Sequence, residues 1–93
     1  MKDLYRDLIN EQWGNIVMMY DSFKDKKPII EYNIADNKIY SFPAEDYING
    51  LTHRKRNMAK TQYEDACSNN QFMLFVRDEK NEKLISYIFE ILE

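Results

Sequence analysis

Residues 71–92 read QFMLFVRDEKNEKLISYIFEIL, which is two apolar runs joined by a charged connector. Both runs are rich in β-branched and aromatic residues, and this pattern with a short polar connector predicts a β-hairpin. A turn at residues 80–81 places Asp78 opposite Lys83 and puts the bulky residues on one face. The facing pairs are then Phe72 with Phe89, Leu74 with Tyr87, and Val76 with Ile85.

Residues 29–34 and 38–42 form a second pair of apolar runs, and they predict a second hairpin. Two registers fit this hairpin. A two-residue turn in the connector places Ile34 opposite Ile39. A bulged turn with Asn37 in the left-handed conformation, which asparagine tolerates, gathers the larger apolar set on one face and is the favoured register. That set is Ile30, Tyr32, Ile34, Tyr40 and Phe42.

Helices are predicted on either side of this second hairpin. Residues 2–23 carry apolar side chains every three or four positions, which indicates one amphipathic helix. Pro43 begins a helical stretch that ends at Gly50, and Thr52 can cap a longer helix that reaches about Cys67. The predicted order of elements is therefore α-β-β-α-α-β-β.

This order predicts an α+β fold in which both hairpins join into a four-stranded antiparallel sheet. Helices are expected to pack on one face of this sheet, which makes a two-layer sandwich. Residues 1–93 are expected to form a single domain, because 44% hydrophobic and 31% charged residues describe a globular chain of this length. Cys67 is the only cysteine, which favours a cytoplasmic location, and no apolar run approaches the ~20 residues that span a bilayer.

A basic segment, residues 53–60, stands out in a chain of net charge −3. Its positive or titratable residues are His53, Arg54, Lys55, Arg56 and Lys60. Cations at the start of a helix oppose the macrodipole, and departures from local rules are more frequent at functional sites. The segment is a solvated face if the helix runs unbroken from Ala44, and otherwise it is a candidate site for an acidic partner or nucleic acid. The segment itself lacks the aromatic residues or glycine-rich loop that base-reading modules use.

Catalysis is the third hypothesis for this chain. His53 is the only histidine, and it is interpreted as structural because neither a triad nor a metal site is indicated by spacing. Walker A, G-x-G-x-x-G, C-x-x-C and H-E-x-x-H patterns are missing, and two glycines leave little room for a phosphate-binding loop. The sequence therefore predicts no cofactor and no metal.

The second face of the C-terminal hairpin is also apolar, and its residues are Met73, Phe75, Leu84, Ile88 and Leu92. An apolar second face indicates burial against another chain, unless the first helix covers one face and the later helices cover the other. The leading hypothesis is a small cytoplasmic protein–protein interaction module that forms a homodimer, with the role of a regulator, adaptor, antitoxin or phage-type inhibitor. The alternative hypothesis is a nucleic-acid-binding protein that uses residues 53–60.

Overall fold

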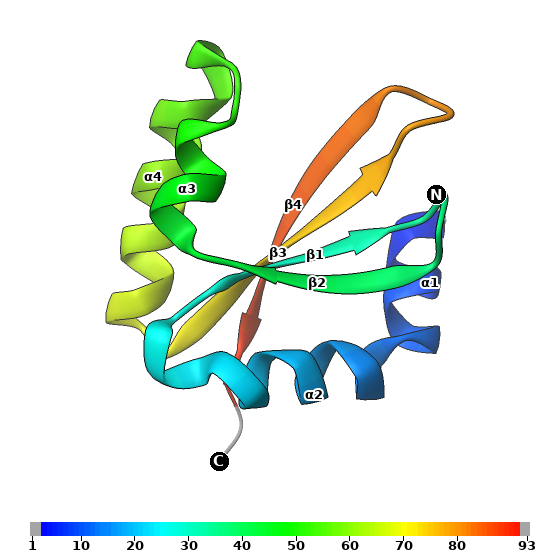
Figure 1. Ribbon diagram of the computed structural model, residues 1–93, viewed down its shortest axis with the longest axis horizontal. Coiled ribbons are helices and arrows are strands. Elements are labelled where there is room, and N and C mark those ends of the chain that lie inside the picture. The colour runs from blue at the N-terminus through cyan, green and yellow to red at the C-terminus, as the bar shows by residue number, and fades with distance from the viewer. Residues whose placement is uncertain (1–2, 92–93) are drawn as a thin grey trace.

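Residues 3–91 are described by a computed structural model of the chain, and the elements follow the predicted α+β order (Figure 1). The helices are α1 (Leu4–Glu11), α2 (Trp13–Phe23), the short 3-10 helix η1 (Lys24–Lys26), α3 (Ala44–Asn49) and α4 (His53–Ser68). The strands are β1 (Ile29–Asn33), β2 (Lys38–Phe42), β3 (Gln71–Asp78) and β4 (Lys83–Glu90).

The four strands form one sheet in the order β2-β1-β3-β4, and this sheet is mixed. Both hairpins are antiparallel, but β1 and β3 run parallel, with Ile30 aligned with Leu74. The prediction of a purely antiparallel sheet is therefore wrong at the centre. The reason is that α3 and α4 run in opposite directions. The chain therefore returns to the end of the sheet at which β2 ends (Figure 1). β3 consequently starts beside the start of β1.

The register of the C-terminal hairpin is confirmed at every predicted pair. Phe72 aligns with Phe89, and Asp78 aligns with Lys83. The intermediate pairs, Leu74 with Tyr87 and Val76 with Ile85, also match. Apolar pattern and cross-strand pairing were therefore sufficient to place this hairpin.

Both registers considered for the first hairpin are wrong. Tyr32 aligns with Ile39, and residues 34–37 form the turn. The physical reason is that the Ile34 N–H donates to the Arg77 carbonyl oxygen at 3.0 Å, so Ile34 is held by β3 and not by β2. Asn37 does adopt the expected left-handed conformation, with φ 52°.

The N-terminal helix breaks at Gln12, so the prediction of one helix over 2–23 is corrected to two helices. The Gln12 N–H is shared between the carbonyl oxygens of Leu8 and Ile9, at 3.2 and 3.1 Å. α1 and α2 then lie at a steep angle to each other, which lets each follow a different part of the sheet (Figure 1). Ile9 and Ile16 remain buried on either side of the break, so the apolar stripe survives it.

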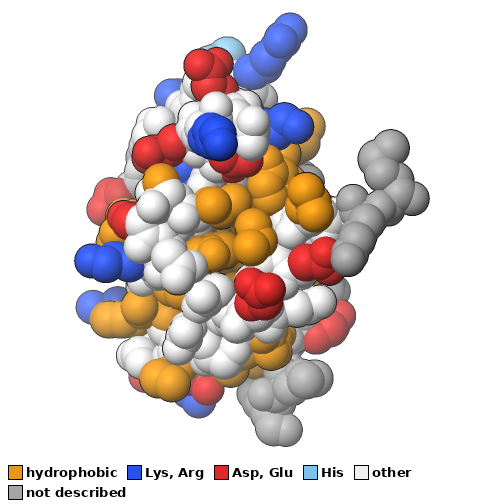
Figure 2. All heavy atoms as spheres, turned by 90° about the vertical axis from the view of Figure 1, so that its right-hand side faces the viewer, with side chains coloured by type: hydrophobic (Ala, Val, Ile, Leu, Met, Phe, Trp, Pro, Cys, Tyr) orange, Lys and Arg blue, Asp and Glu red, His pale blue; other side chains and the backbone are white. Residues whose placement is uncertain are grey.

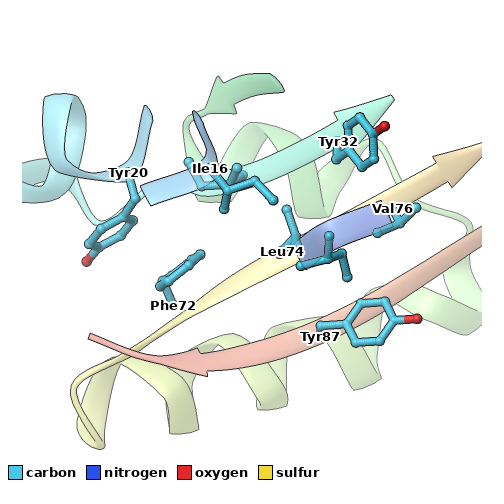
Figure 3. Close-up of a cluster of buried hydrophobic side chains, with 9 residues drawn as sticks. Ile16, Tyr20, Tyr32, Phe72, Leu74, Val76 and Tyr87 are labelled. Atoms are coloured by element: carbon cyan, nitrogen blue, oxygen red, sulfur yellow. The ribbon is translucent and has the colours of Figure 1, made fainter. Parts of the chain in front are cut away.

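The larger core lies between α1, α2 and one face of the sheet. Figure 3 shows Ile16 and Tyr20 of α2 directed toward side chains of the three strands that form the centre and one edge of the sheet. The aromatic part of this larger core contains Tyr20, Phe72 and Phe89, and the ring centroids of Tyr20 and Phe72 lie 4.7 Å apart. The sheet residues of this core are Ile30, Tyr32, Phe72, Leu74, Val76 and Tyr87.

A second core lies on the opposite face, under α3 and α4, so helices pack on the sheet as predicted but occupy both of its faces. Ala59 of α4 and Ile48 of α3 pack there against Met73 and Phe75. Met73 and Phe75 are only 1% and 3% exposed. The hypothesis that these two residues contact another chain is therefore corrected: α3 and α4 already cover them.

Candidate functional site

The basic segment begins α4, after a break in the helix. α3 ends at Asn49 with Gly50 as its C-cap, and α4 starts at His53. The interpretation that one helix runs unbroken through this region is therefore wrong, and the cations do lie in the first turns of α4. His53 and Arg54 are exposed there.

The cations of the basic segment are directed to different parts of the molecule. The Lys55 ammonium donates to the Leu84 carbonyl oxygen of β4 at 3.0 Å. Arg56 and Lys60 instead line a groove on the other side of α4. The structure therefore separates residues that the sequence placed in one candidate site.

This groove, called the α4 groove below, has a volume of about 810 Å³ and lies between α4, α3, η1 and the end of β2. Its apolar lining comes from Phe23, Pro28, Phe42, Pro43, Ala44, Ile48 and Tyr63. Phe23 is 47% exposed, and the Tyr63 hydroxyl donates to the Lys27 carbonyl oxygen at 2.6 Å, which fixes the ring in the wall. Burial raises the pKa of Tyr63. The aromatic residues absent from the basic segment are supplied by Phe23 and Phe42, from distant parts of the chain, and by Tyr63, further along α4.

Carboxylates interleave with the cations of the α4 groove. Glu45 and Glu64 line it together with Arg56 and Lys60, and Lys26 of η1 completes the charged lining. A duplex or single strand presents a row of phosphates, which such carboxylates repel. The mixed charges therefore do not resemble a nucleic-acid surface.

Arg56 has donors to spare in this groove. One terminal nitrogen donates to the Leu51 carbonyl oxygen at 3.3 Å. Its buried Nε has no acceptor among residues 3–91. A guanidinium carries five N–H donors, and a buried donor without a partner costs about 1–3 kcal/mol.

The outer edge of β4 is a second candidate site. The Ile91 N–H donates to the Asn70 carbonyl oxygen at 3.0 Å and extends the ladder between β3 and β4. Because backbone groups alternate in direction along a strand, those of Ser86, Ile88 and Glu90 point away from β3. No backbone group of another element among residues 3–91 bonds to this edge.

The remaining interface candidates lie along β4. Leu84 is half-buried against the second core, whereas Ile88 is 37% exposed on the same face of the sheet. Ile85 is also 37% exposed, on the opposite face. Leu92 lies outside the described residues. Ile88 is thus the described interface candidate that stays accessible.

A buried polar cluster connects the sheet with α3. The Glu31 carboxylate accepts from the Tyr47 hydroxyl at 2.7 Å and from Arg77 Nε at 3.0 Å. Burial, followed by the hydrogen bond to Glu31, raises the pKa of Tyr47. These hydrogen bonds connect α3 through Tyr47 to β1 and β3, so the cluster fastens α3 to the sheet.

A second polar cluster fastens α1 to the tip of the C-terminal hairpin. The Asp78 carboxylate accepts from the Tyr5 hydroxyl at 2.6 Å and from the Asn81 side-chain amide at 2.7 Å. The hydrogen bond from Tyr5, then those from Asn81, lowers the pKa of Asp78. The same bond raises the pKa of Tyr5 to about 12.

The face that carries α1 and both hairpin tips has a hollow of about 890 Å³. Figure 2 shows apolar side chains gathered over the middle of this face, with charged side chains around them. The hollow is lined by Leu4, Leu8 and Ile34, and both signs of charge occur at its rim. No feature of this hollow selects one kind of ligand over another.

Within residues 3–91, no group of three or more His, Cys, Asp or Glu side chains is arranged to hold a metal ion. None of the helices in this range combines the length and apolar character that crossing a bilayer requires. Comparisons with family models, curated proteins and solved structures find no match to this chain. The α4 groove and the β4 edge are therefore interpreted from their own geometry.

Proposed function

We propose that this chain is a small protein-binding module without catalysis, and that it pairs with a second copy of itself through the outer edge of β4. The observation that supports this proposal is the row of outward backbone groups at Ser86, Ile88 and Glu90. An edge strand of this kind is a template for another strand. Its length of eight residues exceeds the five residues of β2 at the other edge.

Exposed apolar side chains accompany this edge on both faces of the sheet. Ile85 lies on the face of α1 and α2, and Ile88 lies on the face of α4. Pairing of a second strand would cover part of each. The apolar contact and the backbone bonds would then stabilise the same arrangement.

A symmetric antiparallel pairing fits these residues when Ile88 faces Ile88 of the second copy. In this register the outward backbone groups of the two strands meet, as an antiparallel ladder requires. Tyr87 then faces Phe89, and Ser86 faces Glu90. The Lys55–Leu84 hydrogen bond occupies the start of the edge, and this register leaves it outside the paired stretch.

The test replaces Ile88 with proline. The Ile88 N–H points away from β3, so Ile88→Pro removes no bond of the β3–β4 ladder but removes a donor that a second copy needs. Ser41→Pro is the matched control on β2. Since the Ile34 N–H bonds to β3, the odd residues of β1 and the even residues of β2 form the β1–β2 ladder, and the Ser41 N–H points outward.

Sedimentation equilibrium is the measurement. The unaltered chain and Ser41→Pro are expected at twice the 11.3 kDa mass of one chain, and Ile88→Pro is expected at 11.3 kDa. Circular dichroism would verify that both variants fold. A single 11.3 kDa species for the unaltered chain at high micromolar concentration would contradict self-pairing. Equal dimerisation of both variants would contradict the assignment to β4.

A further inference from the structure

We propose that the α4 groove binds a small amphipathic carboxylate, with its charged end at Arg56 and Lys60 and its apolar body on the aromatic wall. This site is separate from the β4 edge and does not depend on pairing between two copies. The proposal follows from the size of the groove, its apolar lining and the distribution of charge around it.

The size and lining of the groove suit a small molecule. Its volume of about 810 Å³ lies within the ~300–1,000 Å³ of ligand pockets. Phe42, Ile48 and Tyr63 present apolar surface from a strand and two different helices. Because these elements are fixed by the second core and by the Tyr63 hydrogen bond, the wall exists before a ligand arrives.

Two cations without ion pairs define the charged end. Within residues 3–91, neither Arg56 nor Lys60 has a carboxylate within salt-bridge distance. Both lie on α4 one turn apart, so their side chains share one side of the helix. Only one terminal nitrogen of Arg56 has a protein acceptor, the Leu51 carbonyl oxygen, so other donors of the guanidinium are unused. A carboxylate matches the planar guanidinium and would supply acceptors to it.

The same groove limits the ligand to one negative charge. Glu45 and Glu64 also line the groove and would repel a second anionic group. This arrangement disfavours phosphate chains and dicarboxylates. It leaves a molecule with one carboxylate and an uncharged apolar body, such as a medium-chain fatty acid or an aromatic acid.

Decanoate is the probe, and decanol is its uncharged counterpart. A titration of the ¹⁵N-labelled chain with decanoate is expected to shift the amide signals of Phe42, residues 44–49 and residues 56–64 in a saturable manner. Decanol is expected to bind at least about tenfold more weakly, because it lacks the charge that Arg56 and Lys60 receive. Signals of β4 are expected to stay in place.

Substitutions on α4 distinguish binding in the α4 groove from general electrostatic attraction of the ligand to a positively charged helix. Lys60→Gln and Arg56→Gln are each expected to raise the Kd for decanoate about ten- to a hundredfold. Lys55→Gln removes one charge from the same helix, but its side chain bonds to β4, so its Kd should stay within about twofold. Lys60 is exposed, so Lys60→Gln tests the proposal even if Arg56→Gln disturbs the loop at Leu51.

Four outcomes would overturn the proposal. One is the absence of saturable shifts at millimolar decanoate. Another is decanol binding as tightly as decanoate, or Lys55→Gln weakening binding as much as Lys60→Gln. The last is a set of shifts centred on α1 or β4 instead of the α4 groove.

Discussion

Truncation of Phe72 to alanine tests the larger core directly. Phe72 is 5% exposed, and its ring lies 4.7 Å from that of Tyr20, 5.9 Å from Phe89 and 6.2 Å from Trp13, measured between centroids. These rings belong to α2 and β4, which are held by other contacts and cannot close fully over the space left behind. The full cost of a buried phenylalanine is therefore expected, about 3–5 kcal/mol.

This loss is large compared with the stability of the whole chain. At roughly 0.05–0.15 kcal/mol per residue, 93 residues give a free energy of unfolding of about 5–14 kcal/mol. Phe72→Ala should lower the melting temperature by at least about 12 °C, since 1 kcal/mol corresponds to ~4–8 °C in a domain of this size. Phe72→Leu leaves less empty space and should lose less.

Urea unfolding followed by circular dichroism and by the fluorescence of Trp13 is the assay. The midpoint should fall while the slope with denaturant stays unchanged. Phe23→Ala is the control, because Phe23 is 47% exposed at the end of α2 and should lose less than about 1 kcal/mol. A loss below about 1 kcal/mol for Phe72→Ala would refute the packing described between α2 and the sheet.

The two polar clusters give the remaining predictions. Because the folded-state pKa of Asp78 is lowered, chiefly by Tyr5, its contribution to stability is present above about pH 4 and is lost as the pH falls through the folded pKa. Tyr5→Phe should reduce the loss of unfolding free energy that urea unfolding measures as the pH falls from 6 to 2. An unchanged pH dependence would contradict this assignment. Arg77→Ala should destabilise the fold by about 3 kcal/mol, because it leaves the buried Glu31 carboxylate with only Tyr47 as partner. Adding Glu31→Gln should restore part of this loss, and purely additive losses would show that the two residues are not coupled.

The C-terminal hairpin could be predicted residue by residue because two independent criteria, the apolar face and the charge pairing, gave the same register. One register places the bulky residues of both strands on one face, with Phe72 opposite Phe89, and the same register pairs Asp78 with Lys83. The first hairpin lacked this agreement, since Ile34 is apolar like Ile30 and Tyr32 but its backbone N–H bonds to β3. A local pattern cannot report a bond to a strand that lies so far along the chain.

The candidate sites depended on tertiary structure in the same way. The basic segment is visible in the sequence, but whether Lys55 and Lys60 serve one site depends on which side of α4 meets the sheet. Phe23 and Phe42 are remote from Arg56 in sequence, so the α4 groove had no local signal. The second apolar face of β3 was expected to contact another chain unless the later helices covered it, and the order of strands and helices determined that α3 and α4 do cover it.

The parallel pairing of β1 with β3 has a consequence for synthesis on the ribosome. When the first half of the chain has emerged, β1 and β2 can form a hairpin, but an isolated two-stranded hairpin is marginally stable at best. The other strand that pairs with β1 is β3, and it follows only after β2, α3 and α4 have all been made. Until residues 71–78 emerge, Ile30 and Tyr32 lie on a strand with one open side, which invites pairing with other nascent chains. The middle of the sheet is thus completed only when β3 has been synthesised.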